Sequence, residues 1–216
     1  MKYRCLIVDH DDTVVDSTAT IHHPCFVEYM KRFPPHYRCS LEEYFAANFH
    51  GTLEFFRDVV GMTEAQMRHE SAWWNGYVQS HVPSAYPGMA EILWEHRRRG
   101  GLLCVVSHSY SANILRDYRE NALPEPDLVF GWEYPPELRK PSPWPLDQIM
   151  EKLSLMPDEL LVLDDLKPGF EMARARGVRF AAAGWANDIP EIEDFMRAHC
   201  DDYFKTVPEL RAFLFD

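Results

Sequence analysis

Short unbroken runs of apolar residues alternate along this chain with longer stretches in which apolar residues recur at helical spacing. Runs of this length predict strands that are buried on both faces, as in a parallel sheet. They cover residues 5–8, 102–106, 128–130, 160–163 and 178–182. The amphipathic stretches that follow them cover residues 87–99, 111–121, 143–153, 170–176 and 188–199. Strands that alternate with helices predict an α/β fold with a mostly parallel sheet.

Residues 17–82 break this alternation, because they contain no convincing strand. Ser or Thr followed three residues later by Glu or Gln marks a helix start, and this pattern occurs at Ser40 and Thr63, and again at Thr206 near the end of the chain. We therefore predict a helical insertion at 17–82 and a core formed by 1–16 with 83–216. Most large aromatic residues of the insertion are expected to form its own core: Phe26, Tyr29, Phe45, Phe49, Phe55, Phe56, Trp73 and Trp74.

Composition narrows the class of protein. The 216 residues include 34 acidic and 22 basic side chains, a formal net charge of −12. Proteins that hold nucleic acid need a basic face, and docking on an anionic membrane needs basic residues too, so we expect neither partner. No apolar run approaches the roughly 20 residues of a membrane span, and no signal peptide is visible.

The five cysteines are scattered and form no CxxC pair. Cys5 and Cys104 lie inside apolar runs, where a free thiol behaves as a small hydrophobic side chain. A disulfide framework or a zinc knuckle is therefore not expected. A reducing compartment fits best, and we expect a cytoplasmic protein.

Polar residues follow four of the apolar runs in a definite order. Asp9-His10-Asp11-Asp12-Thr13 follows the first run, Ser107-His108-Ser109 the second, Lys140 the third and Asp164-Asp165 the fourth. A parallel sheet brings the carboxyl ends of its strands to one edge, where α/β proteins form their sites. We therefore expect these side chains to meet.

Each group has an ordinary structural alternative when it is taken alone. The acids would suit solvated turns, Ser107 a helix cap, and Lys140 the protein surface. Together they have a chemical meaning. Two acid pairs suit a hard cation such as Mg²⁺, a hydroxyl and a lysine suit phosphate oxygens, and a further carboxylate would attack phosphorus.

The four motifs resemble those of the haloacid dehalogenase (HAD) superfamily in its phosphatase branch. The matching segments read LIVDHDDTVVDS at the first run, LLCVVS ending at Ser107, Lys140 to Pro143, and LLVLDD ending at Asp164-Asp165. The resemblance implies a Rossmann-like core with a mostly parallel sheet and an inserted α-helical cap. It also implies a Mg²⁺-dependent phosphatase that hydrolyses a small phosphorylated metabolite through an aspartyl-phosphate.

The resemblance also implies a role for each matched residue. Asp9 would be the nucleophile and Asp11 the general acid and base. The phosphate-binding residues would be Thr13, Ser107, His108 and Lys140, with Thr13 also supporting the loop. Mg²⁺ would be held by Asp9, the main-chain carbonyl of Asp11, Asp164 and Asp165.

The chain departs from the family pattern at several positions. Asp12 replaces the usual glycine, and it would either contact the metal shell or point to solvent; we expect solvent exposure. Pro168 and Gly169 stand where many relatives carry a further acid. Candidate specificity residues are His10 beside the nucleophile and, in the cap, His22, His23 and Arg57. Adjacent histidines on a helix point in different directions, so His22 and His23 are not expected to share a metal.

Three other functions remain open. A phosphosugar mutase would use the same aspartyl-phosphate, a dehalogenase would lack the second aspartate and the metal, and a binding protein would retain the fold without catalysis. Intact Asp9, Asp11, Ser107, Lys140 and Asp164 favour the phosphatase. We expect a monomer or a homodimer.

Overall fold

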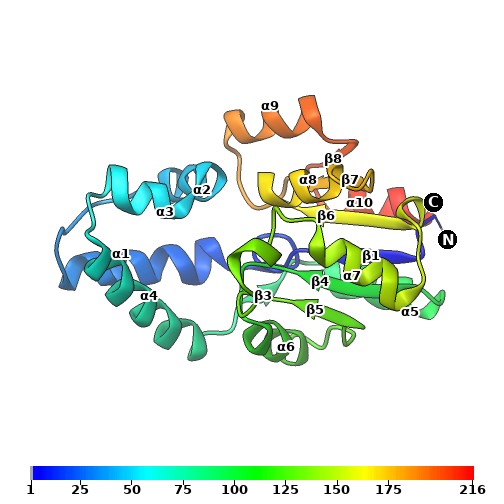
Figure 1. Cartoon of the computed structure of the whole chain (residues 1–216), viewed down its shortest axis with the longest axis horizontal. Coiled ribbons are helices and arrows are strands. Elements are labelled where there is room, and N and C mark those ends of the chain that lie inside the picture. Colours follow the sequence, from blue (N-terminus) through cyan, green and yellow to red (C-terminus); the bar gives the residue numbers. More distant parts are fainter. Residues whose placement is uncertain (1) are drawn as a thin grey trace. The chain divides into compact units, whose positions relative to one another are not determined.

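The computed structural model describes residues 2–216. Its contacts divide the chain into two compact units, one containing the residues up to Asp16 together with Ser84–Asp216, the other Ser17–Pro83 (Figure 1). We call them the core unit and the cap unit. Each is described by itself.

A six-stranded parallel sheet forms the centre of the core unit, in the order β5-β4-β1-β6-β7-β8. The strands are β1 (Cys5–Val8), β4 (Leu102–Val106), β5 (Leu128–Phe130), β6 (Leu160–Asp164), β7 (Arg179–Ala183) and β8 (Asp202–Phe204). A two-residue antiparallel pair, β2 (Val15–Asp16) with β3 (Ser84–Ala85), lies outside this sheet. The predicted α/β fold with a mostly parallel sheet is confirmed. β8 was not predicted, because only one of its three residues is buried.

Helices connect the strands of the core unit (Figure 1). They are α5 (Met89–Arg98), α6 (Ser111–Glu120), α7 (Trp144–Leu153), α8 (Lys167–Arg174), α9 (Pro190–His199) and α10 (Val207–Phe215), with short 3₁₀ turns η3 (Pro136–Leu138) and η4 (Pro157–Glu159). α8 begins earlier than the predicted residue 170, because proline is tolerated in the first turn of a helix.

Alternate residues of the strands pack under different helices. Leu6 and Val8 of β1 belong to a buried cluster that also contains Met89 and Ile92 of α5 and Ile114 of α6. Successive side chains of a strand point to opposite faces, so Cys5 and Ile7, both 0% exposed, lie on the other face. Burial on both faces explains why these strands appear in the sequence as unbroken apolar runs.

The cap unit is helical. It contains α1 (His23–Arg32), α2 (Leu41–His50), α3 (Thr52–Glu54) and α4 (Glu64–Gln79), with π-helical segments η1 (Thr18–His22) and η2 (Phe55–Val59). The predicted capping boxes at Ser40 and Thr63 are both formed, as is the one at Thr206 in the core unit. Phe26, Tyr29 and Phe56 pack together with partly buried Phe55 and Trp73, so the expected aromatic core is confirmed.

Glu70 of α4 is a buried acid inside the cap unit, 6% exposed. Burial raises its pKa to about 7, although the nearby His22 opposes the shift. The folded protein then binds more protons than the unfolded chain between the ordinary pKa of 4.5 and about 7. Stability therefore falls as the pH rises through this interval.

We expect Glu70→Gln to stabilise the protein by about 2–3 kcal/mol at pH 8, because the neutral amide avoids burying a charge. The gain should disappear near pH 4, where the carboxyl is protonated in both states. Urea unfolding at the two pH values measures it. The same substitution at exposed Glu42 should change the free energy of unfolding by under about 1 kcal/mol. Equal effects at both pH values would contradict the shifted pKa.

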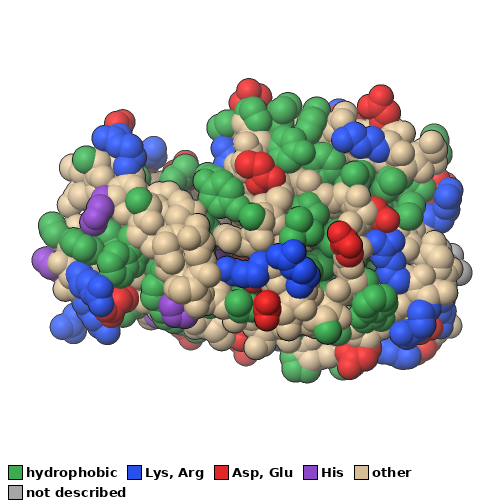
Figure 2. Space-filling view, turned by 90° about the horizontal axis from the view of Figure 1, so that it is seen from below, with side chains coloured by type: hydrophobic (Ala, Val, Ile, Leu, Met, Phe, Trp, Pro, Cys, Tyr) green, Lys and Arg blue, Asp and Glu red, His purple; other side chains and the backbone are tan. Residues whose placement is uncertain are grey.

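The surface bears on the expected partners. Among residues 2–216, no helix combines the length and the apolar character that a membrane span requires. On the face shown in Figure 2, basic side chains are interspersed with acidic ones rather than gathered into one basic area.

Each of the five cysteines is a free thiol.

Candidate active site

Three aspartates meet at the carboxyl edge of the sheet. Asp9 directly follows β1, while Asp164 ends β6 and Asp165 follows it. β1 and β6 are neighbours in the sheet, and their pairing extends to Asp9, whose N–H donates to the Leu163 carbonyl oxygen at 2.8 Å. One carboxylate oxygen from each aspartate lies within 4.8 Å of the others, and all three residues are buried. The expected meeting of the first and fourth motifs is therefore observed.

Lys140 binds two of these aspartates. It lies between η3 and α7 and is 6% exposed. Its Nζ donates to Asp9 Oδ1 at 2.8 Å and to Asp164 Oδ2 at 2.6 Å. Three carboxyl groups thus share one ammonium group in this buried cluster.

The pKa values of Lys140, Asp164 and Asp165 are shifted by their burial and by one another's charges. Burial alone would lower the pKa of Lys140, but the carboxylates of Asp164 and Asp9 outweigh it and raise the pKa. Burial raises the pKa of Asp164, and Lys140 only partly offsets the effect. Burial also raises the pKa of Asp165, with the neighbouring charge of Asp12 acting in the same direction. A divalent cation would balance this charge.

Two neighbouring residues support the cluster: Thr13, which matches the family pattern, and Gly169, which departs from it. The fully buried Thr13 hydroxyl donates to Asp165 Oδ1 at 3.4 Å, and its carbonyl accepts from Trp185 Nε1 at 3.2 Å. Thr13 thus supports the loop, as expected. At Gly169, an added Cβ would lie only 2.1 Å from Asp164 Oδ2. An acid at position 169 would displace Asp164, which explains the glycine there.

The second motif forms the loop between β4 and α6. Ser107 is 3% exposed, and its Oγ accepts the N–H of Ser109 at 3.1 Å. His108 is exposed, and its Nε2 lies 3.0 Å from the Lys140 carbonyl oxygen. Surrounding protein atoms lower the pKa of His108 to about 4, and the Lys140 cation acts in the same direction. The imidazole is therefore neutral near pH 7 and links the second and third motifs.

Asp12 does not point to solvent as expected, since it is 4% exposed. Its φ of 59° lies in the left-handed region, which Asp adopts more readily than most residues, and this explains how it replaces glycine. The adjacent Asp11 is half-buried, and its Oδ2 accepts the Ser109 hydroxyl at 2.5 Å.

His10 is buried inside the core unit, and its specificity role stays a prediction. The side chain is 1% exposed, and Nε2 lies 3.0 Å from Asp117 Oδ2 of α6. Arg116 binds the other oxygen of the same carboxylate. His10 therefore ties the loop after β1 to α6 from inside the protein.

The candidate residues of the cap unit have partners within that unit. His22 Nδ1 accepts the Trp74 indole N–H at 3.0 Å, and His23 Nε2 lies 2.9 Å from the Cys39 carbonyl oxygen. Exposed Arg57 forms an ion pair with Asp58 at 2.7 Å. Their roles toward substrate stay predictions.

Residues 6–183 match the family model of the haloacid dehalogenase-like hydrolases. No curated protein sequence matches the chain. A haloacid dehalogenase-like hydrolase from Bacteroides fragilis has 22% identity and a TM-score of 0.81, covering 97% of this chain and 100% of its own. A predicted phosphoglycolate phosphatase from Haemophilus somnus has 17% identity and a TM-score of 0.77, covering 99% of each chain. CbbY from Rhodobacter sphaeroides, crystallised with phosphate, has 19% identity and a TM-score of 0.73, covering 96% of each chain.

The chain therefore belongs to the haloacid dehalogenase-like hydrolase family. The structural likenesses support the same fold over nearly the full chain. Within the core unit, the three buried aspartates form a group of carboxylate oxygens that could hold a metal ion.

Two contacts of the predicted site residues were not expected from the sequence. Ser109 binds Asp11, and Asp117 binds His10. Ser109 carries a weak signal, a second hydroxyl two positions after Ser107. Nothing in the sequence distinguishes Asp117 from an ordinary polar residue of an amphipathic helix.

Proposed function

We propose that this chain is a Mg²⁺-dependent phosphatase that hydrolyses the phosphate monoester of a small metabolite through an aspartyl-phosphate on Asp9. The observation that carries the proposal is the double contact of Lys140, whose Nζ donates to both Asp9 and Asp164 inside the buried acidic cluster. A lysine and a hydroxyl beside three carboxylates can bind a phosphoryl group and a cation together.

The donor set fits Mg²⁺. Asp9, Asp164 and Asp165 offer carboxylate oxygens, and the main-chain carbonyl of Asp11 would complete the protein ligands. When bound, Mg²⁺ would offset the negative charge of the phosphoryl oxygens and orient them. The excess of carboxyl groups over the single ammonium group of Lys140 supports this assignment.

The residues then divide the reaction between them. An oxygen of Asp9 forms a bond to phosphorus while the bond to the leaving oxygen breaks, and Asp11 gives that oxygen a proton. Water next attacks the phosphorus and gives its proton to Asp11, which releases phosphate and restores Asp9. Ser107 and Lys140 would bind the phosphoryl oxygens throughout, beside the neutral His108.

The relatives support a small phosphorylated substrate. Three similar structures are described as phosphoglycolate phosphatases. CbbY is seen with phosphate, and a mutant of it with xylulose-1,5-bisphosphate. The net charge of −12 supports a partner other than nucleic acid or an anionic membrane. We further propose a cytoplasmic protein that acts as a monomer or a homodimer.

A panel of phosphorylated metabolites, assayed for released phosphate with Mg²⁺ and with EDTA, tests the proposal. We expect at least one ester to be hydrolysed, and chelation to lower its rate by about 100-fold or more. A rate that EDTA leaves unchanged would contradict the metal requirement. Conversion of a phosphosugar into its isomer without phosphate release would instead favour the mutase.

A further inference from the structure

Ser109 contacts the proposed acid–base residue directly. It lies in the loop between β4 and α6, is 6% exposed, and its hydroxyl donates to Asp11 Oδ2 at 2.5 Å. A hydrogen bond to a carboxylate is short and strong for its type. The bond joins two loops that are 98 residues apart in the sequence.

The backbone around Ser109 is itself held in place. The Ser109 N–H donates to Ser107 Oγ at 3.1 Å, and the Ser109 carbonyl accepts the Trp132 N–H at 2.9 Å. A Cβ added at Gly131 would lie 2.7 Å from the Ser109 carbonyl oxygen, so only glycine allows this close approach. The backbone that carries the hydroxyl is therefore held by contacts that do not involve Asp11.

We infer that Ser109 is a positioning residue for Asp11, and the inference rests on the proposed phosphatase function. Its hydroxyl holds one oxygen of the Asp11 carboxyl and so fixes the rotation of the group that exchanges the proton. Its N–H occupies a lone pair of Ser107 Oγ, which leaves the Ser107 proton for a phosphoryl oxygen. One residue thus sets the distance between the phosphate-binding hydroxyl and the acid–base carboxyl.

The proton balance defines what Ser109 does and does not do. Asp11 gives a proton to the leaving oxygen in the first step and takes one from water in the second. Ser109 keeps its own proton in both steps, and no bond to it forms or breaks. Its removal should therefore slow those reactions whose leaving group needs a proton, since misplacing a catalytic group by about 1 Å can cost about 100-fold in rate.

Two kinds of ester separate this role from a structural one. p-Nitrophenyl phosphate releases a stable anion that needs little protonation, whereas an alkyl phosphate releases a strongly basic alkoxide. The value of kcat/KM reports the steps up to release of the leaving group. For Ser109→Ala we expect kcat/KM to fall about 10- to 100-fold on the best alkyl phosphate and under about threefold on p-nitrophenyl phosphate.

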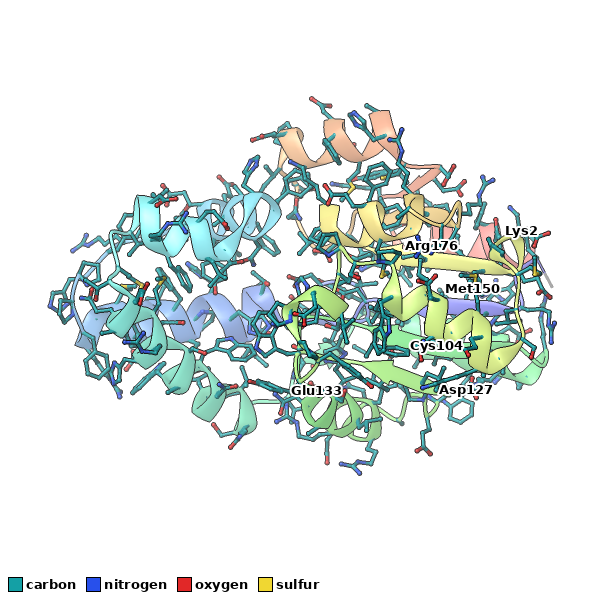
Figure 3. The ribbon with its side chains drawn as sticks, viewed as in Figure 1. Lys2, Cys104, Asp127, Glu133, Met150 and Arg176 are labelled. Carbon is teal, nitrogen blue, oxygen red and sulfur yellow. The ribbon has the colours of Figure 1, made fainter. Side chains whose placement is uncertain are left out.

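Ser111→Ala is the matched control. Ser111 opens α6 and donates its hydroxyl to the carboxylate of Glu133, which Figure 3 shows beside the first turn of that helix. The control removes the same kind of bond two residues further along the chain, without touching Asp11, and should retain kcat/KM on both esters. Ser109→Thr restores a hydroxyl and should recover most of the rate on the alkyl ester.

The outcomes separate the two proposals. Equal falls of kcat/KM on both esters, or no fall on the alkyl ester, would overturn the positioning role of Ser109 while phosphate release by the wild-type protein upheld the phosphatase. A wild-type protein that releases phosphate from neither ester with Mg²⁺ overturns the proposed function, and the role of Ser109 with it. Circular dichroism of Ser109→Ala should match that of the wild type.

Discussion

Replacing Asp9 by asparagine should lower the rate of phosphate release by at least about a thousandfold, because the neutral amide cannot attack phosphorus. The fold should survive the change. Lys140 keeps its bond to Asp164 at 2.6 Å, and the change removes one carboxyl group from a buried acidic cluster. Phosphate release with the best substrate of the panel and a thermal unfolding curve measure the two effects.

Phosphate release and thermal unfolding are also measured for a control variant. Asp158→Asn makes the same substitution at an exposed position beyond α7, and it should leave the rate unchanged. Mass spectrometry of protein quenched during turnover should detect a phosphorylated chain in the wild type and none in Asp9→Asn. If Asp9→Asn released phosphate at the wild-type rate, the nucleophile would have to lie elsewhere.

The sequence predicts where the site residues lie along the chain better than it predicts where their side chains point. Strands buried on both faces leave unbroken apolar runs, and each run ends where a polar residue begins, so Asp9, Ser107 and Asp164 could be found without a structure. The parallel order of strands then brings their ends together. β8, with one buried residue of three, leaves no such run.

Side-chain directions depend on backbone angles that the sequence leaves open. Asp12 is buried at a φ of 59°, whereas the sequence alone suggested a solvated loop acid. His10 points into the protein toward Asp117, a partner 107 residues away on α6. The contact between Ser109 and Asp11 likewise spans two loops, and no local spacing reports it.

Lys140 should matter for stability as well as for catalysis. It is 6% exposed, and its ammonium is the cation that contacts both Asp9 and Asp164. Methionine keeps much of the length and the apolar packing of the side chain but leaves the carboxylates uncompensated. Removing one partner of a buried ion pair costs about 3–5 kcal/mol. We expect Lys140→Met to destabilise the protein by about this amount and to lose measurable phosphatase activity.

Urea unfolding with and without Mg²⁺ separates the electrostatic cause from a packing defect. If the buried carboxylates repel one another in Lys140→Met, Mg²⁺ should restore part of the lost stability, because a divalent cation offsets the same charge. Lys152→Met, at an exposed position of α7, should change the stability by under about 1 kcal/mol. A Lys140→Met protein that unfolds at the wild-type urea concentration would mean that the ammonium does not stabilise this cluster. A large loss that Mg²⁺ fails to reduce would point to packing instead, because a cavity or a clash does not respond to charge.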